Sequence, residues 1–84
     1  KEGSRLPEWA AADCYLDVSG SLCPEPVIKA KAQLNSMRPG DVLEIHASDP
    51  LAELDLAVMC DHLGHLLLQS GTFDGLVRVQ IRRA

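Results

Sequence analysis

The order of apolar and polar residues along this chain predicts alternating strands and helices from residue 14 onward. Residues 14–18 alternate around a β-rich centre and end at Ser19-Gly20, which predicts a short strand. Apolar residues then recur at spacings of three and four, which is the stripe of an amphipathic helix. This helix is expected to begin at Pro24 and to stop at Pro39-Gly40, because proline biases the residue before it away from helix.

The second half of the chain repeats the change from strand to helix. Residues 41–47 form the second predicted strand, and Asp49-Pro50 marks a helix start, with an N-cap acid followed by proline. Gly64 is expected to close this helix as its C′ residue. Residues 65–70 and 76–82 read as two further strands, and Asp74-Gly75 between them is a strong hairpin turn signal.

The faces of the second helix can be assigned from the same pattern. Its core stripe comprises Ala52, Leu56, Met59, Cys60 and Leu63, with Leu54 and Val58 widening it. The expected solvent side comprises Glu53, Asp55, Asp61 and His62. A stripe of this width is typical of a helix that packs on a sheet.

Together these elements predict an α+β fold, a βαβαββ two-layer sandwich with two helices on one face of a mixed four-stranded sheet. The first two strands flank a helix and should be parallel, with a right-handed crossover, whereas the last two should form an antiparallel hairpin. Residues 1–13 have no period and are expected to be a flexible arm before a single domain at 14–84.

The composition argues against several classes of binding partner. The chain has 84 residues and a net charge of −4, without a basic stripe, so direct nucleic-acid binding is not expected. Its aromatic residues are only Trp9, Tyr15 and Phe73, too few for a base-stacking platform. No apolar run approaches the roughly 20 residues of a membrane span, so no membrane partner is expected.

The three cysteines, Cys14, Cys23 and Cys60, are widely spaced and odd in number. This arrangement is not a disulfide framework, and the chain has no Cys-x-x-Cys pair for a zinc or thioredoxin-type site. The pattern predicts free thiols in a reducing, cytoplasmic compartment, with no cofactor and no metal.

Cys23 is the candidate for chemistry because it falls where the first strand ends and the first helix begins. With Pro24 at the first helical position, Cys23 would be the N-cap, beside the unpaired N–H groups of the first turn. The positive helix end favours a thiolate, whereas Glu25 opposes it, so the pKa of Cys23 should be lowered only modestly. Pro24 and Pro26 should stiffen the junction. The alternative is a small buried cysteine at a turn.

These residues resemble the TusA/SirA family of small sulfur carriers. The similarity covers residue 15 to the C-terminus, in matching order and spacing. Its landmarks are Leu16-Asp17, Gly20, Cys23-Pro24-Glu25-Pro26, Pro39-Gly40, Asp49-Pro50, Asp55 and Gly64-His65.

The resemblance implies the same βαβαββ fold and a function. Cys23 would carry sulfur as a persulfide, with Gly20, Pro24, Glu25 and Pro26 shaping the site or contacting partners. A cysteine desulfurase or rhodanese-type protein would be the donor, and a DsrE-like or other cysteine-bearing protein the acceptor. Family members serve tRNA thiolation, molybdenum-cofactor supply or sulfur oxidation. The chain would thus act with partners rather than as a stand-alone enzyme.

Two other functions stay open on the sequence. One is a regulatory interaction module that binds a partner without sulfur chemistry. The other is a thiol redox sensor, which would need Cys14 or Cys60 as the resolving thiol for Cys23.

The remaining polar and sulfur-bearing residues have structural interpretations. We expect Cys60 to pack in the core, Cys14 to be structural, Asp49 to cap a helix and Asp55 to be solvated or locally hydrogen-bonded. His62 and His65 lack an evident third ligand for a metal. The three arginines Arg78, Arg82 and Arg83 are expected on a solvated strand face, with a docking patch for an acidic partner as the alternative.

Overall fold

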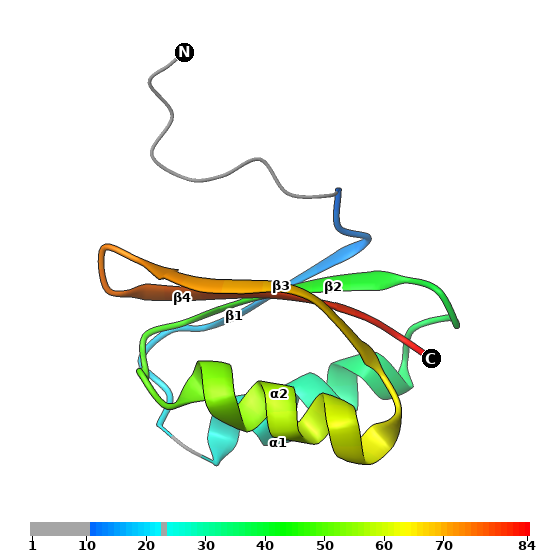
Figure 1. Ribbon diagram of the computed structural model, residues 1–84, viewed down its shortest axis with the longest axis horizontal. Helices are drawn as coiled ribbons and strands as arrows, with labels where there is room; N and C mark the ends of the chain where they lie inside the picture. The colour runs from blue at the N-terminus through cyan, green and yellow to red at the C-terminus, as the bar shows by residue number, and fades with distance from the viewer. Residues whose placement is uncertain (1–10, 23) are drawn as a thin grey trace.

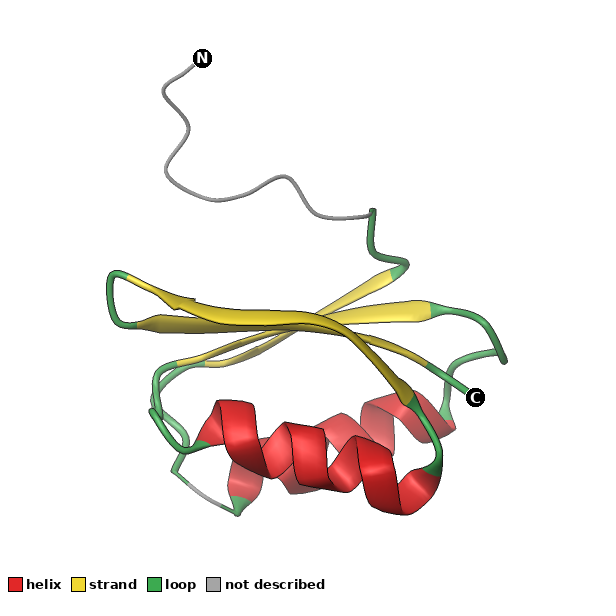
Figure 2. Cartoon of the chain, viewed as in Figure 1, coloured by secondary structure: helices red, strands yellow, loops and turns green. Residues whose placement is uncertain are grey.

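A computed structural model describes residues 11–22 and 24–84, and this part of the chain forms two helices and four strands. In chain order they are β1 (Cys14–Val18), α1 (Glu25–Asn35), β2 (Val42–Ala47), α2 (Ala52–Leu63), β3 (Leu66–Phe73) and β4 (Leu76–Arg82). The strands form one sheet, and both helices lie on the same face of it (Figure 1) (Figure 2). The predicted α+β two-layer sandwich with the order βαβαββ is therefore confirmed.

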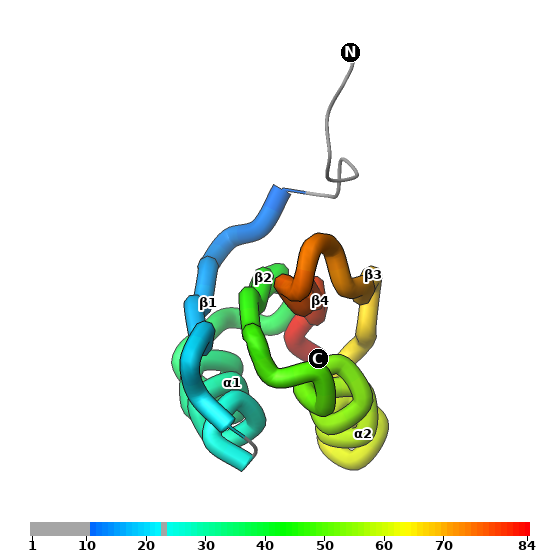
Figure 3. Tube along the Cα trace, turned by 90° about the vertical axis from the view of Figure 1, so that its left-hand side faces the viewer, coloured from blue at the N-terminus to red at the C-terminus, as the bar shows by residue number. Residues whose placement is uncertain are grey.

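The sheet has the strand order β1-β2-β4-β3, with α1 below the β1 side and α2 below the β3 side (Figure 3). β1 and β2 are parallel, and β4 is antiparallel to both of its neighbours, as the predicted hairpin requires. Because β1 and β2 are parallel and Val18 is paired with Ala47, both strands end at the same edge of the sheet. The loops that lead into α1 and α2 therefore start side by side.

The hairpin between β3 and β4 has the two-residue turn expected from Asp74-Gly75. Both residues have positive φ, 53° for Asp74 and 80° for Gly75, and Phe73 is paired with Leu76 across the turn. Positive φ at both central residues is the type I′ geometry, whose twist matches that of the flanking strands.

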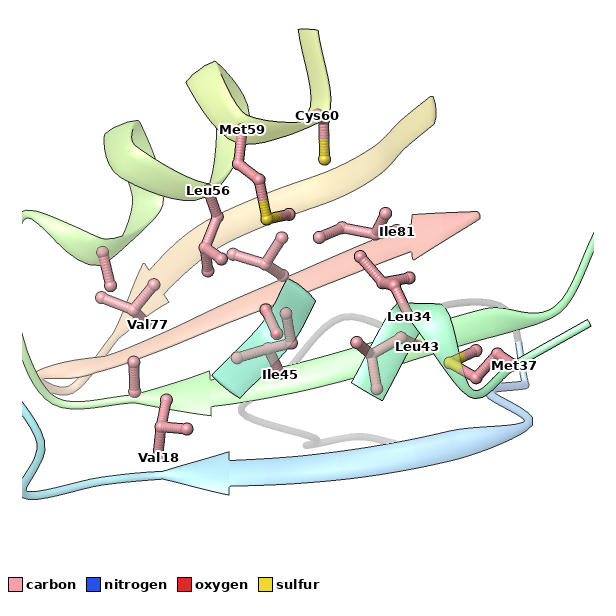
Figure 4. Packing of buried hydrophobic residues seen from close by; sticks show 14 residues of the cluster. Val18, Leu34, Met37, Leu43, Ile45, Leu56, Met59, Cys60, Val77 and Ile81 are labelled. Atoms are coloured by element: carbon pink, nitrogen blue, oxygen red, sulfur yellow. The ribbon is translucent and has the colours of Figure 1, made fainter. Parts of the chain in front are cut away.

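The core lies between the sheet and the two helices. Leu56, Met59 and Cys60 of α2 and Leu34 of α1 point toward the inward side chains of β2 and β4 (Figure 4). The buried cluster comprises Val18, Ala30, Leu34, Met37, Leu43, Ile45, Ala47, Ala52, Leu56, Met59, Cys60, Val77, Val79 and Ile81. The apolar positions of β2 and β4 alternate with polar ones, so the inward face of the sheet supplies half of this core.

The helix boundaries differ slightly from those expected. α1 begins at Glu25 with Pro24 as its N-cap, one residue later than predicted, so Pro26 occupies the second helical position. α2 begins at Ala52, although Asp49 still supports the preceding turn by accepting a hydrogen bond from the N–H of Leu51 at 3.0 Å. Gly64 ends α2 in the left-handed conformation, with φ 79°, as predicted.

A polar network occupies the sheet face away from the helices. Glu44 accepts hydrogen bonds from Arg78 Nε at 2.8 Å, from Gln80 Nε2 at 2.8 Å and from His46 Nε2 at 2.7 Å. Burial opposes ionisation of Glu44, but these hydrogen bonds prevail and lower its pKa to about 2. Arg78 is therefore held in an ion pair with Glu44 on the sheet and does not lie on a solvated face.

The other two arginines also depart from the expected common face. Arg83 donates from Nε to the carbonyl of Leu34 at 2.6 Å, which ties the C-terminal segment to α1. Arg82 is exposed at the end of β4. The three arginines therefore have separate environments, and the interpretation of one solvated face was wrong for Arg78 and Arg83.

The described chain is hydrogen bonded from just before β1. Asp13 donates its N–H to the carbonyl of Val42 at 2.8 Å, and its Oδ2 accepts from the N–H of Val42 at 2.8 Å. Within residues 1–13, expected as a flexible arm, residues 1–10 lie outside the described part. Asp13 itself is held against the start of β2.

Candidate functional site

The candidate site is the segment from Ser19 to Pro26, which links β1 to α1. Cys23 lies outside the described residues, but Pro24 is the N-cap of α1, so the expectation that Cys23 is the N-cap was wrong. The residues on both sides of Cys23 are described, and their contacts define how the segment is held.

The first part of the segment is anchored to the end of β1. Ser19 donates from its N–H and its hydroxyl to Asp17 Oδ1, at 2.9 and 2.6 Å. These two hydrogen bonds, the hydroxyl first, lower the pKa of the Asp17 carboxyl. The N–H of Ser21 donates to the carbonyl of Val18 at 3.0 Å. The chain therefore leaves β1 through a turn with a defined direction.

Gly20 joins this turn to the loop after β2. Its N–H donates to Ser48 Oγ at 2.8 Å, and its φ of +85° lies in the left-handed region, where a residue with a Cβ is strained. No atom stands within 4 Å of where a Cβ would be, so the backbone conformation, not space, calls for glycine. This contact supports the prediction that Gly20 shapes the site.

The second part of the segment is fixed by α1. The N–H of Glu25 donates to the carbonyl of Leu22 at 2.9 Å, which links the residues on either side of the Cys23–Pro24 pair. The N–H of Ile28 donates to the carbonyl of Pro24 at 3.1 Å. Pro26 is fully buried, whereas Pro24 and Glu25 are exposed. Pro26 thus anchors the start of α1 in the protein.

The first turn of α1 has fewer unpaired N–H donors than a helix start without prolines. Pro24 and Pro26 have no N–H, and the N–H of Glu25 is bonded to Leu22. Anion binding at a helix start depends on such unpaired donors as well as on the helix dipole. The helix end therefore supplies less stabilisation to an anion beside it than a start without prolines would.

An apolar groove between α1 and α2 begins at Pro24, directly after Cys23 in the chain. Its volume is about 540 Å³. The residues that line it are Pro24, Val27, Lys31, Leu54, Asp55, Val58, Met59, His62 and Leu63. Most of these side chains are apolar, so the groove suits a protein partner better than a small polar substrate.

The walls of this groove correct the expected faces of α2. Leu54 and Val58 were assigned to the core stripe, but they are 64% and 48% exposed. Leu63 is also exposed, whereas Glu53 points to β3 and accepts a hydrogen bond from Ser70 Oγ at 2.9 Å. A signal for this was present, because apolar residues at 51, 54 and 58 form a second stripe at helical spacing.

Further exposed apolar side chains lie on α1 and in the loops that precede the two helices. Leu22, immediately before Cys23, is 73% exposed, and Ile28 of α1 and Leu51 before α2 are exposed as well. A smaller hollow of about 330 Å³ lies beside the groove and shares Leu54 with it. The described residues on either side of Cys23 in the chain, Leu22 and Pro24, are therefore both exposed and apolar.

The two described cysteines, neither of them in a disulfide, differ in environment. Cys60 is 2% exposed within the core, and burial raises the pKa of its thiol to about 11. It packs in the core as predicted, and a thiol of this kind is inert at neutral pH. Cys14 is partly buried at the start of β1.

The histidines His62 and His65 have separate environments. His62 lines the groove, whereas His65 accepts a hydrogen bond at Nδ1 from the N–H of Ala84 at 3.0 Å. Among residues 11–22 and 24–84 no group of three or more His, Cys, Asp or Glu side chains could hold a metal ion. Asp55 is partly buried at the groove rather than fully solvated.

No helix within the described ranges is long and apolar enough to cross a membrane.

Comparison with known proteins gives consistent matches over this whole region. The family model described as sulfurtransferase TusA matches residues 15–83. The sulfur carrier protein TusA of Pseudomonas putida strain F1 is 38% identical over 65 residues, covering 73% of this chain and 81% of that protein. The sulfur carrier protein TusA of Pseudomonas aeruginosa strain LESB58 is 33% identical over 73 residues, covering 87% of this chain and 92% of that protein.

A solved structure has the same architecture. The crystal structure of a SirA-like protein from Desulfitobacterium hafniense superposes with a TM-score of 0.73 at 27% sequence identity. The match covers 82% of this chain and 95% of that chain. The similarity therefore covers most of this chain and nearly all of the solved one.

Proposed function

Because the chain belongs to the TusA family of sulfur carriers, we propose that it holds its sulfur as a persulfide on Cys23. The observation that carries this proposal is the Cys23-Pro24-Glu25-Pro26 motif in a segment whose flanking residues are held from both sides. A carrier needs a nucleophilic sulfur that another protein can reach, and a firmly anchored segment beside an open groove meets that need.

The transfer consists of two thiol exchange steps. In loading, the Cys23 thiolate attacks the outer sulfur of the donor's persulfide, the donor S–S bond breaks, and the donor leaves as a thiolate. In unloading, a thiolate of the acceptor attacks the outer sulfur on Cys23, which is released as a thiolate. Each step forms one S–S bond and breaks one, so neither requires an external oxidant or reductant.

The donor and acceptor are proteins with reactive cysteines. By resemblance to the family, we infer a cysteine desulfurase or rhodanese-type donor and a DsrE-like or other cysteine-bearing acceptor. Both must reach the same sulfur, so they would use the surface around Pro24 in turn. We infer that each presents apolar side chains to the groove walls at Val27, Leu54 and Val58, since burial of exposed apolar surface favours association.

Cys60 does not compete for the sulfur in this proposal. Cys60 is enclosed in the core with a pKa of about 11, so neither a donor nor an acceptor can approach it in the folded protein. The same burial argues against Cys60 as the resolving thiol of a redox sensor. No described contact or comparison favours an interaction module without sulfur chemistry. We place the carrier in the cytoplasm, where thiols stay reduced.

Loading of the full chain by a cysteine desulfurase, with cysteine as substrate, tests this function. Intact mass measurement should find one added sulfur on the wild-type chain and on Cys14→Ser, and none on Cys23→Ser. The adduct should be removed by a reducing thiol, as a persulfide is. An adduct of the same yield on Cys23→Ser, or none on the wild type with several donors, contradicts the proposal.

A further inference from the structure

The apolar groove follows the two helices along the helical layer. β1 and β2 end at the same edge of the sheet, so α1 and α2 both start there and lie side by side in the same direction (Figure 3). The groove extends from Pro24, before α1, to His62 and Leu63 at the end of α2. The 12 residues of α2 span about 18 Å, so the groove has room for a segment of about three helical turns.

The walls of the groove favour a helix over an extended segment. Only three of the lining residues, Lys31, Asp55 and His62, have polar side chains. The backbone groups of α1 and α2 are largely bonded within each helix, so they offer no ladder to an added strand. An extended segment would bury backbone N–H and C=O groups without partners, which is costly. A helix bonds its own backbone groups and presents only side chains to the groove.

The exposed side of α2 has the spacing of a helix that packs on another helix. Leu51, Leu54 and Val58 lie three and four residues apart and are 59%, 64% and 48% exposed. Apolar residues at such spacing form the seam along which two helices interlock. Leu54 stands between the groove and the smaller hollow of about 330 Å³, so side chains of an added helix can enter on both sides of it.

The two walls of the groove differ in charge. Lys31 lines the wall formed by α1 and Asp55 the wall formed by α2. α2 has three acidic residues and no lysine or arginine, whereas α1 has two lysines and one glutamate. A docked helix is therefore complementary if acidic side chains face α1 and basic side chains face α2. The α2 helix of a second copy does not meet this requirement, because it would bring further acids to an acidic wall.

We propose that the groove between α1 and α2 binds an amphipathic helix of a relay partner, in which an apolar stripe separates an acidic flank from a basic one. This inference deepens the proposed function, and it rests on that function only for the identity of the partner as a sulfur donor or acceptor. The apolar stripe packs on Val27, Leu54 and Val58. The flanks set the direction of the bound helix, because turning the helix end to end exchanges them.

A synthetic peptide of about 18 residues, long enough to form a helix, is the probe. It has leucines along one stripe, glutamates on one flank and lysines on the other. Fluorescence anisotropy of the labelled peptide should show saturable binding to the full chain, and circular dichroism should show a gain of helix on binding. A peptide of the same composition with its leucines scattered should bind about tenfold more weakly.

Variants of the full chain locate the binding. Leu54→Asp should weaken binding of the probe about tenfold. Lys31→Glu should weaken it about fivefold and should strengthen binding of a peptide with lysines on both flanks. Lys29→Glu is the matched control, because it makes the same change in charge on the same helix at a residue that does not line the groove. It should bind the probe as the wild type does.

Several results would overturn the inference. These are equal binding of the scattered peptide, an equal loss of affinity in Lys29→Glu, and binding without a gain of helix. A dimer of the chain alone in sedimentation, lost in Leu54→Asp, would assign the groove to a second copy and would also contradict it. Sulfur loading by the desulfurase is measured separately. Loading without peptide binding contradicts this inference alone, whereas peptide binding without loading contradicts only the proposed function.

Discussion

Glu44→Gln tests the polar network on the sheet face away from the helices. Glu44 is 3% exposed and has a pKa of about 2, against an ordinary value of 4.5. Each pKa unit corresponds to about 1.4 kcal/mol, so ionised Glu44 contributes up to about 3 kcal/mol to folding at neutral pH. Because each kcal/mol shifts Tm by about 4–8 °C in a domain of this size, Glu44→Gln should melt about 10–20 °C lower at pH 7.

The pH dependence of this effect has a defined sign. The folded pKa of Glu44 is depressed, so its contribution is complete above about pH 4.5 and is lost as the pH falls toward about 2. Urea unfolding at a series of pH values should therefore find wild type and Glu44→Gln converging in acid. Asp61→Asn, which removes an exposed carboxylate from α2, controls for the change in net charge. A gap between wild type and Glu44→Gln that stays constant from pH 7 to pH 2 would refute the reasoning.

Three further predictions concern the site and the core. Leu54→Asp should slow sulfur transfer to the acceptor about tenfold with little loss of stability, since Leu54 is exposed in the groove. The control Leu66→Asp, at an exposed position of β3, should leave the rate of sulfur transfer unchanged. Gly20→Ala should lower the free energy of unfolding by about 1–2 kcal/mol, measured in urea, because the φ of +85° strains alanine; an unchanged midpoint would contradict this. Cys60 should react with a thiol reagent at pH 8 only as fast as the chain opens, and reaction at the rate of a free thiol would show that its burial is wrong.

Local sequence patterns predicted the strands and turns well where their conformation depends mainly on neighbouring residues. The bounds of β1 and β4 agree with the structure because alternation over five to seven residues defines a half-buried strand. The Asp74-Gly75 turn and the Gly64 helix end were also correct, since positive φ restricts both positions to a few residue types. The predicted helix starts were one and two residues early, because Pro24 and Pro50 each lie in a turn that precedes the helix.

Long-range arrangement could not be derived in this way. The insertion of β4 between β2 and β3 joins residues far apart in the chain, and no local pattern specifies it. The same holds for Glu44 and Arg78, which are 34 positions apart and meet only through the register of β2 and β4. The exposure of Leu54 depends on the position of α1 beside α2, so the groove was missed although its residues were visible.

At the candidate site, sequence reasoning identified some of the residues that hold the segment and missed others. Gly20 and Pro26 were singled out from the sequence, and the structure gives each a reason, a left-handed φ and a buried ring. Lys29 was treated as an ordinary residue on another face of the helix. Its contact with Glu25 is an i,i+4 pair that helical spacing predicts, whereas its contact with Ser21 depends on how the segment before α1 lies against the helix.

The central claim is that the sulfur is carried on Cys23, and peptide mapping after loading tests it most directly. A protease that cleaves before aspartate separates the three cysteines, because Cys14 falls in residues 13–16, Cys23 in 17–40 and Cys60 in 55–60. After loading by a cysteine desulfurase and trapping of persulfides by alkylation, the account predicts the added sulfur in peptide 17–40, and its loss on incubation with the acceptor. Added sulfur in peptide 13–16 or 55–60, with 17–40 unmodified, would contradict it.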